Sequence, residues 1–229
     1  MSRRGIVAIA LLGAIVVGSL ALAGAFRRHP QPVPPPQVEA PRVVIAIDPG
    51  HGGRDPGGVV GDVLEKDVNL QIATRLAELI SAQPGLKPFL TRSEDITVPN
   101  LDRLRAAEAA GAVLYLSIHT NSYSDPGVHG AETLVDDTRA KDDPSWILAE
   151  AVQKELVAAT GARDRGVKPQ SLYLEHTKLP AVSVEVGFLT AADEGRALLS
   201  PEYQEKVARG LLNGILSYLE RVNALPPGG

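Results

Sequence analysis

The chain has 229 residues, 44% hydrophobic and 22% charged, which is typical of one globular domain with a substantial core. It contains no cysteine, which excludes disulfide bridges, thiolate metal sites, a cysteine nucleophile and a lipid-anchored lipoprotein. Any metal must therefore be held by histidine and carboxylate side chains. The net charge is −4, and the first 40 residues carry four arginines against one glutamate, so the remainder carries −7. Such an acidic folded part argues against binding nucleic acid or anionic lipid.

The first 28 residues read as a targeting segment. Arg3 and Arg4 precede an uncharged stretch over residues 5–26 that is rich in Ala, Leu, Ile, Val and Gly. This stretch reaches the roughly 20 residues needed to span a bilayer. Ala21-Leu22-Ala23 also resembles a signal-peptidase site. Residues 1–28 are therefore expected to be either a cleaved signal peptide or an N-terminal membrane anchor.

A proline-rich stretch separates this segment from the folded part. Residues 29–41 contain six prolines, which predict a stiff, extended tether and not a domain. We expect one catalytic domain over residues 42–221 and a flexible tail over residues 222–229.

The folded part opens with a strand, a glycine-rich loop and a helix. Residues 43–47 are apolar and β-branched, and the sequence Pro-Gly-His-Gly-Gly follows directly, with His51 at its centre. Glycines beside this histidine favour a backbone with positive φ angles. Glu65 begins a run with helical spacing of apolar residues, and a side chain in a first helical turn leans back toward the preceding loop. His51 and Glu65 are therefore expected to meet as half of a metal site, the alternative being a solvated histidine in an ordinary turn.

Further apolar runs and helical patterns follow in alternation. We expect strands over 87–91, 113–118, 131–135, 172–174 and 181–186, and helices over 65–80, 100–110, 144–160 and 201–219. Pro144 and Pro201 stand at first helical positions, and Ser200 is a helix cap. This order predicts a three-layer α/β domain, with a mostly parallel or mixed sheet and helices on both faces.

Two more candidate site residues lie at strands. His119 follows the apolar strand 113–118, so it should lie at the same sheet edge as His51, unless it is a core or capping histidine. Glu185 interrupts the apolar run PAVSVEVGF, where a buried carboxylate is costly unless it is paired, metal-bound or catalytic. The alternative is an alternating strand that turns Ser183 and Glu185 to solvent. Two histidines and one glutamate that leave a fourth position to water form a known catalytic zinc arrangement.

Seven segments of the chain carry a family resemblance. The segments are IDPGHGGRDPGG, LEKDVNL, LTR, LYLSIHTN, DRGVK, LPAVSVEVGF and the closing helix. In this order and at this spacing the chain resembles the zinc-dependent N-acetylmuramoyl-L-alanine amidases. The resemblance implies that His51, Glu65 and His119 bind one Zn²⁺ per chain and that Glu185 is the catalytic glutamate. Asp48 could orient the imidazole of His51 as a neighbour that does not itself bind the metal, or it could cap the turn.

The resemblance also implies a substrate and a place of action. The expected reaction is hydrolysis of the amide between N-acetylmuramic acid and L-alanine in peptidoglycan. The alternatives are a zinc carboxypeptidase or endopeptidase acting on the stem peptide, or a peptidoglycan-binding module without catalysis. We expect an exported monomer in the periplasm or cell envelope, with membrane contact only through residues 5–26 if they are not cleaved.

Other residues are assigned minor roles. His129 is expected at the surface, the alternative being a place at the border of the cleft, and His176 is assigned no role. A nucleophilic pair of Ser117 and His119 lacks an orienting acid. Some members of the family carry an extra helix that covers the zinc until a partner removes it. Between His119 and Glu185 no spare amphipathic stretch remains for such a helix, so the site is expected to be open.

Overall fold

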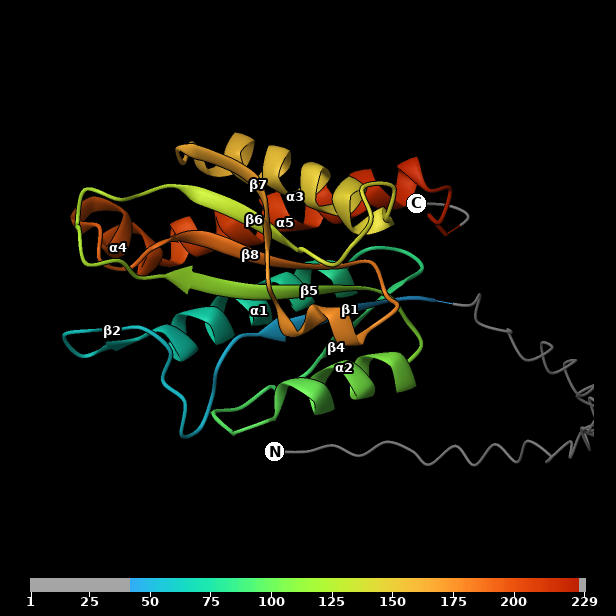
Figure 1. Ribbon diagram of the computed structural model, residues 1–229, viewed down its shortest axis with the longest axis horizontal. Helices are drawn as coiled ribbons and strands as arrows, with labels where there is room; N and C mark the ends of the chain where they lie inside the picture. Colours follow the sequence, from blue (N-terminus) through green and yellow to red (C-terminus); the bar gives the residue numbers. More distant parts are fainter. Residues whose placement is uncertain (1–41, 227–229) are drawn as a thin grey trace, which may run out of the picture. The chain divides into compact units, whose positions relative to one another are not determined.

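The structure is a computed structural model that describes residues 42–226 (Figure 1). The segments expected to be a signal or anchor and a tether lie outside the described residues. The strands are β1 (Val43–Pro49), β2 (Val59–Val60), β3 (Val63–Leu64), β4 (Leu86–Leu90), β5 (Ala112–Asn121), β6 (Ala131–Asp136), β7 (Asp164–Gln170) and β8 (Ala181–Phe188). The helices are α1 (Glu65–Ser81), α2 (Asn100–Ala109), α3 (Pro144–Thr160), α4 (Ala192–Leu198) and α5 (Pro201–Arg221), with a 3₁₀ turn η1 (Tyr173–His176).

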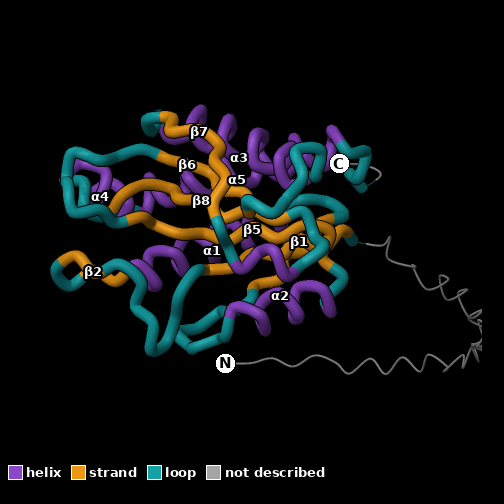
Figure 2. Tube along the Cα trace, in the orientation of Figure 1, coloured by secondary structure: helices purple, strands orange, loops and turns teal. Residues whose placement is uncertain are grey.

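Six strands form one mixed sheet in the order β4-β1-β5-β8-β6-β7 (Figure 2). Strands β4, β1, β5 and β8 are parallel to one another, whereas β6 is antiparallel to β8 and parallel to β7. Strands β2 and β3 form a separate hairpin just before α1. The start of β6 therefore lies beside the carboxyl end of β8. The expected α/β fold with a mixed sheet is confirmed.

Two hydrophobic clusters lie on opposite faces of this sheet. Because strand side chains alternate between faces, Ile45 packs in the larger cluster with α1, α3 and α5, while Ala46 packs in the smaller one with α2 and η1. The larger cluster requires close helix packing at Gly214. A Cβ atom there would approach the Cα of Val152 in α3 to 2.5 Å. The glycines of the last helix thus serve close packing, as the sequence indicated.

The predicted first residues of α3 and α5 and the predicted cap Ser200 are confirmed. The Ser200 side chain accepts a hydrogen bond from the backbone N–H of Tyr203 and caps α5. Asp143 caps α3 in the same way, and Gly161 ends that helix with a φ of 71°. None of the helices within residues 42–226 combines the length and the apolarity that a bilayer crossing requires.

The structure differs from the sequence prediction at several elements. The expected strand 172–174 is instead the turn η1, because Leu174 enters the smaller cluster and its carbonyl accepts a hydrogen bond from Arg139. The prediction missed β7, an edge strand whose sequence DRGVKPQ is polar and contains Pro169, which an edge strand tolerates. It also missed α4, which is only seven residues long and too short for a clear helical period.

The start of the expected flexible tail packs on the domain. Ala224 lies against the larger cluster, and its backbone N–H donates to the Leu219 carbonyl at 2.8 Å. Pro226 is buried beside Gly85, where a Cβ atom would come within 2.4 Å of the proline Cβ. Within the described residues, positions 224–226 are thus part of the packed domain.

Candidate metal centre

The loop after β1 carries His51 in an unusual backbone conformation. His51 has a φ of 62°, in the left-handed region that non-glycine residues rarely adopt. Gly50 has an ordinary φ but needs to lack a side chain, since a Cβ atom there would lie 2.2 Å from the His119 ring. Glycine at position 50 thus lets the loop of one histidine lie directly against the ring of the other.

Two buried arginines hold the backbone of this loop. Arg103 of α2 donates to the carbonyl of Pro49 at 2.7 Å and to that of His51 at 2.6 Å. Arg92, just after β4, donates to the carbonyls of Pro49 and Gly50, both at 2.9 Å. Each arginine is 3% exposed. The sequence prediction assigned these arginines no role, and they fix the path of the loop into the site.

Glu65 enters the site as the first residue of α1. Its carboxylate accepts hydrogen bonds from the backbone N–H of Gly58 at 2.8 Å and from the Asn69 side chain at 3.2 Å. The backbone N–H of Thr120 adds a third bond at 3.3 Å. These donors come from the residue just before the β2–β3 hairpin, from α1 and from the end of β5. They fix the carboxylate at the point where those elements meet.

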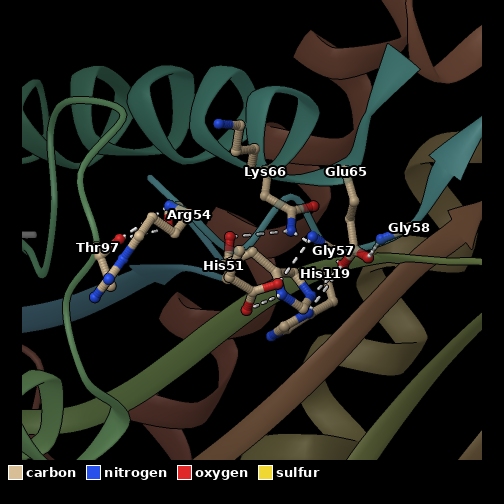
Figure 3. Close-up of polar contacts among 12 residues, drawn as sticks. His51, Arg54, Gly57, Gly58, Glu65, Lys66, Thr97 and His119 are labelled. Carbon is tan, nitrogen blue, oxygen red and sulfur yellow. Dashed lines mark hydrogen bonds and ion pairs between the residues drawn. The ribbon is translucent and has the colours of Figure 1, made fainter. Parts of the chain in front are cut away.

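The two histidines converge on this carboxylate, as Figure 3 shows. His51 Nε2 lies 3.2 Å and His119 Nδ1 lies 3.0 Å from Glu65 Oε1. The imidazole rings meet edge to face with centroids 4.9 Å apart. One ligand atom from each of the three residues lies within 4.8 Å of the others, so together they could hold a metal ion. The structure therefore brings together the three residues that the sequence selected.

The charge of Glu65 controls the proton affinity of both rings. Burial lowers the pKa of His51, but contacts with Glu65 and Asp55 outweigh it and raise this pKa to about 9. The pKa of His119 also rises, because Glu65 and Glu185 outweigh its burial. The pKa of Glu65 falls below its usual range, since hydrogen bonds with both histidines outweigh its burial. The centre thus favours positive charge next to the Glu65 carboxylate. A metal ion can supply this charge in place of the protons on the two histidines.

Glu185 lies next to His119 across the β5–β8 ladder. Its Oε2 atom is buried and has no hydrogen-bond partner among the described residues. Burial raises the pKa of Glu185 to about 7; the charge of His119 opposes this rise, and the charge of Glu65 adds to it. The alternative of a strand that turns Ser183 and Glu185 to solvent is wrong, because Ser183 is 6% exposed and Glu185 is half-buried with its Oε2 atom enclosed.

Asp48 does not orient His51. Its carboxylate is buried and accepts hydrogen bonds from Ser117 at 2.7 Å and Arg103 at 2.8 Å. The partner of His51 is Asp55, whose Oδ2 lies 2.8 Å from His51 Nδ1. The idea that Asp48 supports the imidazole is therefore wrong. Asp55 stands four residues after His51 in a loop, where no periodic pattern marks a contact.

The remaining sequence candidates lie away from the centre or make other contacts. His129 is exposed, as expected, and His176 is exposed as well. The Ser117 hydroxyl donates to Asp48. Between His119 and Glu185 the described chain forms β6, α3, β7 and η1. The side chains of His51 and His119 are 25% and 19% exposed, so both reach solvent.

Comparison with known proteins gives the family. The family model described as N-acetylmuramoyl-L-alanine amidase matches residues 45–217. N-acetylmuramoyl-L-alanine amidase LytC of Bacillus subtilis (strain 168) is 40% identical over 175 residues, which are 76% of this chain and 35% of LytC. This chain thus spans about a third of that relative. A sporulation-specific amidase of the same organism is 34% identical over 176 residues, 76% of this chain and 67% of the relative.

Solved structures agree with this result. An N-acetylmuramoyl-L-alanine amidase from Clostridium difficile 630 superposes with a TM-score of 0.75 at 34% identity, over 79% of this chain and 98% of that one. Amidase AmiC2 of Nostoc punctiforme gives a TM-score of 0.74 at 34% identity, over 80% and 99% of the two chains. The sequence match, the fold and the converging His, Glu and His side chains together show that the chain belongs to the N-acetylmuramoyl-L-alanine amidase family.

Proposed function

We propose that this chain hydrolyses the amide bond between N-acetylmuramic acid and L-alanine in peptidoglycan, with one zinc ion held by His51, Glu65 and His119. The observation that carries the proposal is the group of three ligand atoms within 4.8 Å of one another, next to a buried oxygen of Glu185 that has no hydrogen-bond partner within residues 42–226. Two imidazoles and one carboxylate are a ligand set that Zn²⁺ uses in catalytic sites with an open position. Zinc in such a site polarises a carbonyl and makes water more acidic.

The side chains of this chain supply the proton chemistry. Glu185 accepts a proton from the attacking water and returns it to the amine of L-alanine as the amide bond breaks. Its burial beside His119 keeps this carboxyl close to the reacting groups and away from bulk water. Asp55 accepts the Nδ1–H of His51, which leaves Nε2 free to act as a ligand. The buried arginines keep the loop of His51 in place during turnover.

The site of action follows from the substrate. Peptidoglycan lies outside the cytoplasmic membrane, so we propose an exported monomer in the periplasm or cell envelope. Residues 5–26 would either be cleaved as part of a signal peptide or anchor the chain.

Mass spectrometry of digested sacculi tests the reaction. Cleavage by an amidase leaves free stem peptides with an L-alanine amine, together with intact glycan strands. A carboxypeptidase or endopeptidase leaves shortened peptides on the glycan, and a binding module releases nothing. The Glu185→Gln protein is the matched control. Either of the last two product patterns from the unmodified protein would refute the proposed reaction.

A further inference from the structure

Glu185 belongs to a row of polar side chains that crosses one face of the sheet. In the strand register, His119 of β5 stands opposite Glu185 of β8, and Glu185 stands opposite Glu132 of β6. Directly opposed residues point to the same face of a sheet. Glu132 is 7% exposed and contacts two cations of β7, Arg165 and Lys168. The row therefore runs from the metal centre through the acid–base residue to a pair of positive side chains.

An irregularity in β7 brings these two cations together. Residues 165 and 168 are three apart, so a regular strand would turn them to opposite faces. In the β6–β7 register, however, Ala131 pairs with Asp164 and Thr133 pairs with Val167, which gives β7 one extra residue. Gly166 lies in this extra stretch with a φ of 80°. Such bulges redirect side chains, often beside active sites, and here the bulge places both cations against Glu132.

The two cations keep unused binding capacity. Arg165 Nε and Lys168 Nζ lie 2.7 and 2.5 Å from the same oxygen, Glu132 Oε2. The terminal nitrogens of Arg165 have no protein acceptor among residues 42–226, and its guanidinium carbon lies 4.9 Å from the ring centroid of Phe188. The side chains of Arg165 and Lys168 are 24% and 43% exposed. Two cations against one carboxylate leave one positive charge, facing solvent, in an otherwise acidic domain.

We propose that Arg165 and Lys168 form a subsite that binds a carboxylate of the stem peptide, on the leaving-group side of the cleaved amide. The inference rests on the proposed function. Strand β7 lies two strand spacings from β8, about 10 Å, which an extended peptide covers in about three residues. The carboxyl group of muramic acid is itself used in the amide, so the substrate's free carboxylates lie on its peptide. Glu132 holds the two cations side by side, and both side chains are partly exposed.

Synthetic muramoyl peptides with matched charges test this subsite. Three peptides are compared: one with a free carboxylate at the residue after L-alanine, one with a carboxamide there, and one amidated only at the C-terminus. We expect kcat/KM for the unmodified chain to fall by about 5- to 30-fold when the recognised carboxylate becomes an amide. Comparison of the two amidated peptides identifies which carboxylate binds.

The variants separate recognition from stability. Arg165→Ala and Lys168→Ala should each collapse the ratio of kcat/KM between carboxylate and amide peptides, and Arg165→Lys should retain part of it. Arg209→Ala is the matched control, because Arg209 also pairs with a glutamate, Glu205 at 2.7 Å, but on α5. This control should leave the ratio unchanged. A role confined to stability would lower activity on all peptides equally.

Two results would overturn the inference. One is equal cleavage of all three peptides by the unmodified chain, and the other is an unchanged ratio in folded Arg165→Ala and Lys168→Ala proteins. If the unmodified chain cleaves no peptide, the proposed function fails. The existence of the subsite is then tested by calorimetric titration, which measures the affinity of the same peptides for the unmodified chain and the variants. Loss of carboxylate preference in the variants would support it, and equal binding would overturn it.

Discussion

Removal of Arg103 should destabilise the domain far more than removal of an exposed arginine. Its guanidinium makes hydrogen bonds to Asp48 at 2.8 Å and to the carbonyls of Val98, Pro49 and His51 at 2.6 to 2.8 Å. Arg103→Ala would leave the Asp48 carboxylate, which is 1% exposed, without its cation. Breaking a buried ion pair in this way costs about 3–5 kcal/mol. We expect a loss of that size in the free energy of unfolding.

Thermal and urea unfolding of the metal-free proteins measure this loss. For a domain of this size, it corresponds to a decrease in Tm of roughly 6–20 °C. Arg105→Ala is the matched control in the same helix. Arg105 is 74% exposed and pairs with Asp102 at 3.2 Å, so its removal should change stability by at most about 1 kcal/mol. Equal losses in the two variants would refute the argument from burial.

The pH dependence gives a second check on the same pair. Burial alone would raise the pKa of Asp48, but the charge of Arg103 and hydrogen bonds from Thr91, Arg103 and Ser117 hold it below its usual value. A carboxyl group with a pKa lowered by folding adds stability above its unfolded pKa, and that stability is lost as the pH falls through its folded pKa. The deficit of Arg103→Ala should thus be complete at pH 7 and shrink below about pH 4. A deficit independent of pH would contradict this assignment.

The remaining predictions concern the metal centre. His51→Ala and His119→Ala should sharply lower zinc content by metal analysis, and full occupancy in both would rule out the site. Asp55→Ala should weaken zinc affinity by about 10- to 100-fold in a competition titration with a chelator, because His51 loses its Nδ1 partner. Glu185→Gln should keep zinc and fold but lower turnover by about 10²–10⁴-fold in a peptide-release assay, and near-normal turnover would make Glu185 structural. Residues 42–229 with zinc should solubilise sacculi without an activator, and inactivity until a second protein is added would show that the site is covered.

The main strands and the converging residues were predictable for a common reason. His51, His119 and Glu185 each lie in or directly beside a run of apolar, β-branched residues, and a polar side chain stands out there. Glu65 stands at the start of a regular helical pattern. The carboxyl ends of parallel strands lie at one edge of a sheet, so local patterns were enough to place these residues near one another.

The supporting residues were not predictable from local patterns. Asp48 is adjacent to the loop in sequence, yet the loop turns His51 away from it and toward Asp55. That turn depends on the left-handed backbone of His51, a conformation that non-glycine residues adopt only uncommonly. Arg92 and Arg103 read as ordinary charged residues after a strand and in a helix. Their burial follows from tertiary packing, which the sequence pattern does not encode.

The conformation of His51 explains why such distant support is present. A non-glycine residue in the left-handed region carries backbone strain of about 1–3 kcal/mol, and it persists only where its surroundings hold it. Here the carbonyls of residues 49–51 accept four hydrogen bonds from Arg92 and Arg103. A fifth comes from the Asn69 side chain, at 3.4 Å to the Gly50 carbonyl. The loop of His51 is thus held by α2, α1 and the segment after β4, so the position of the His51 side chain depends on elements on both faces of the sheet.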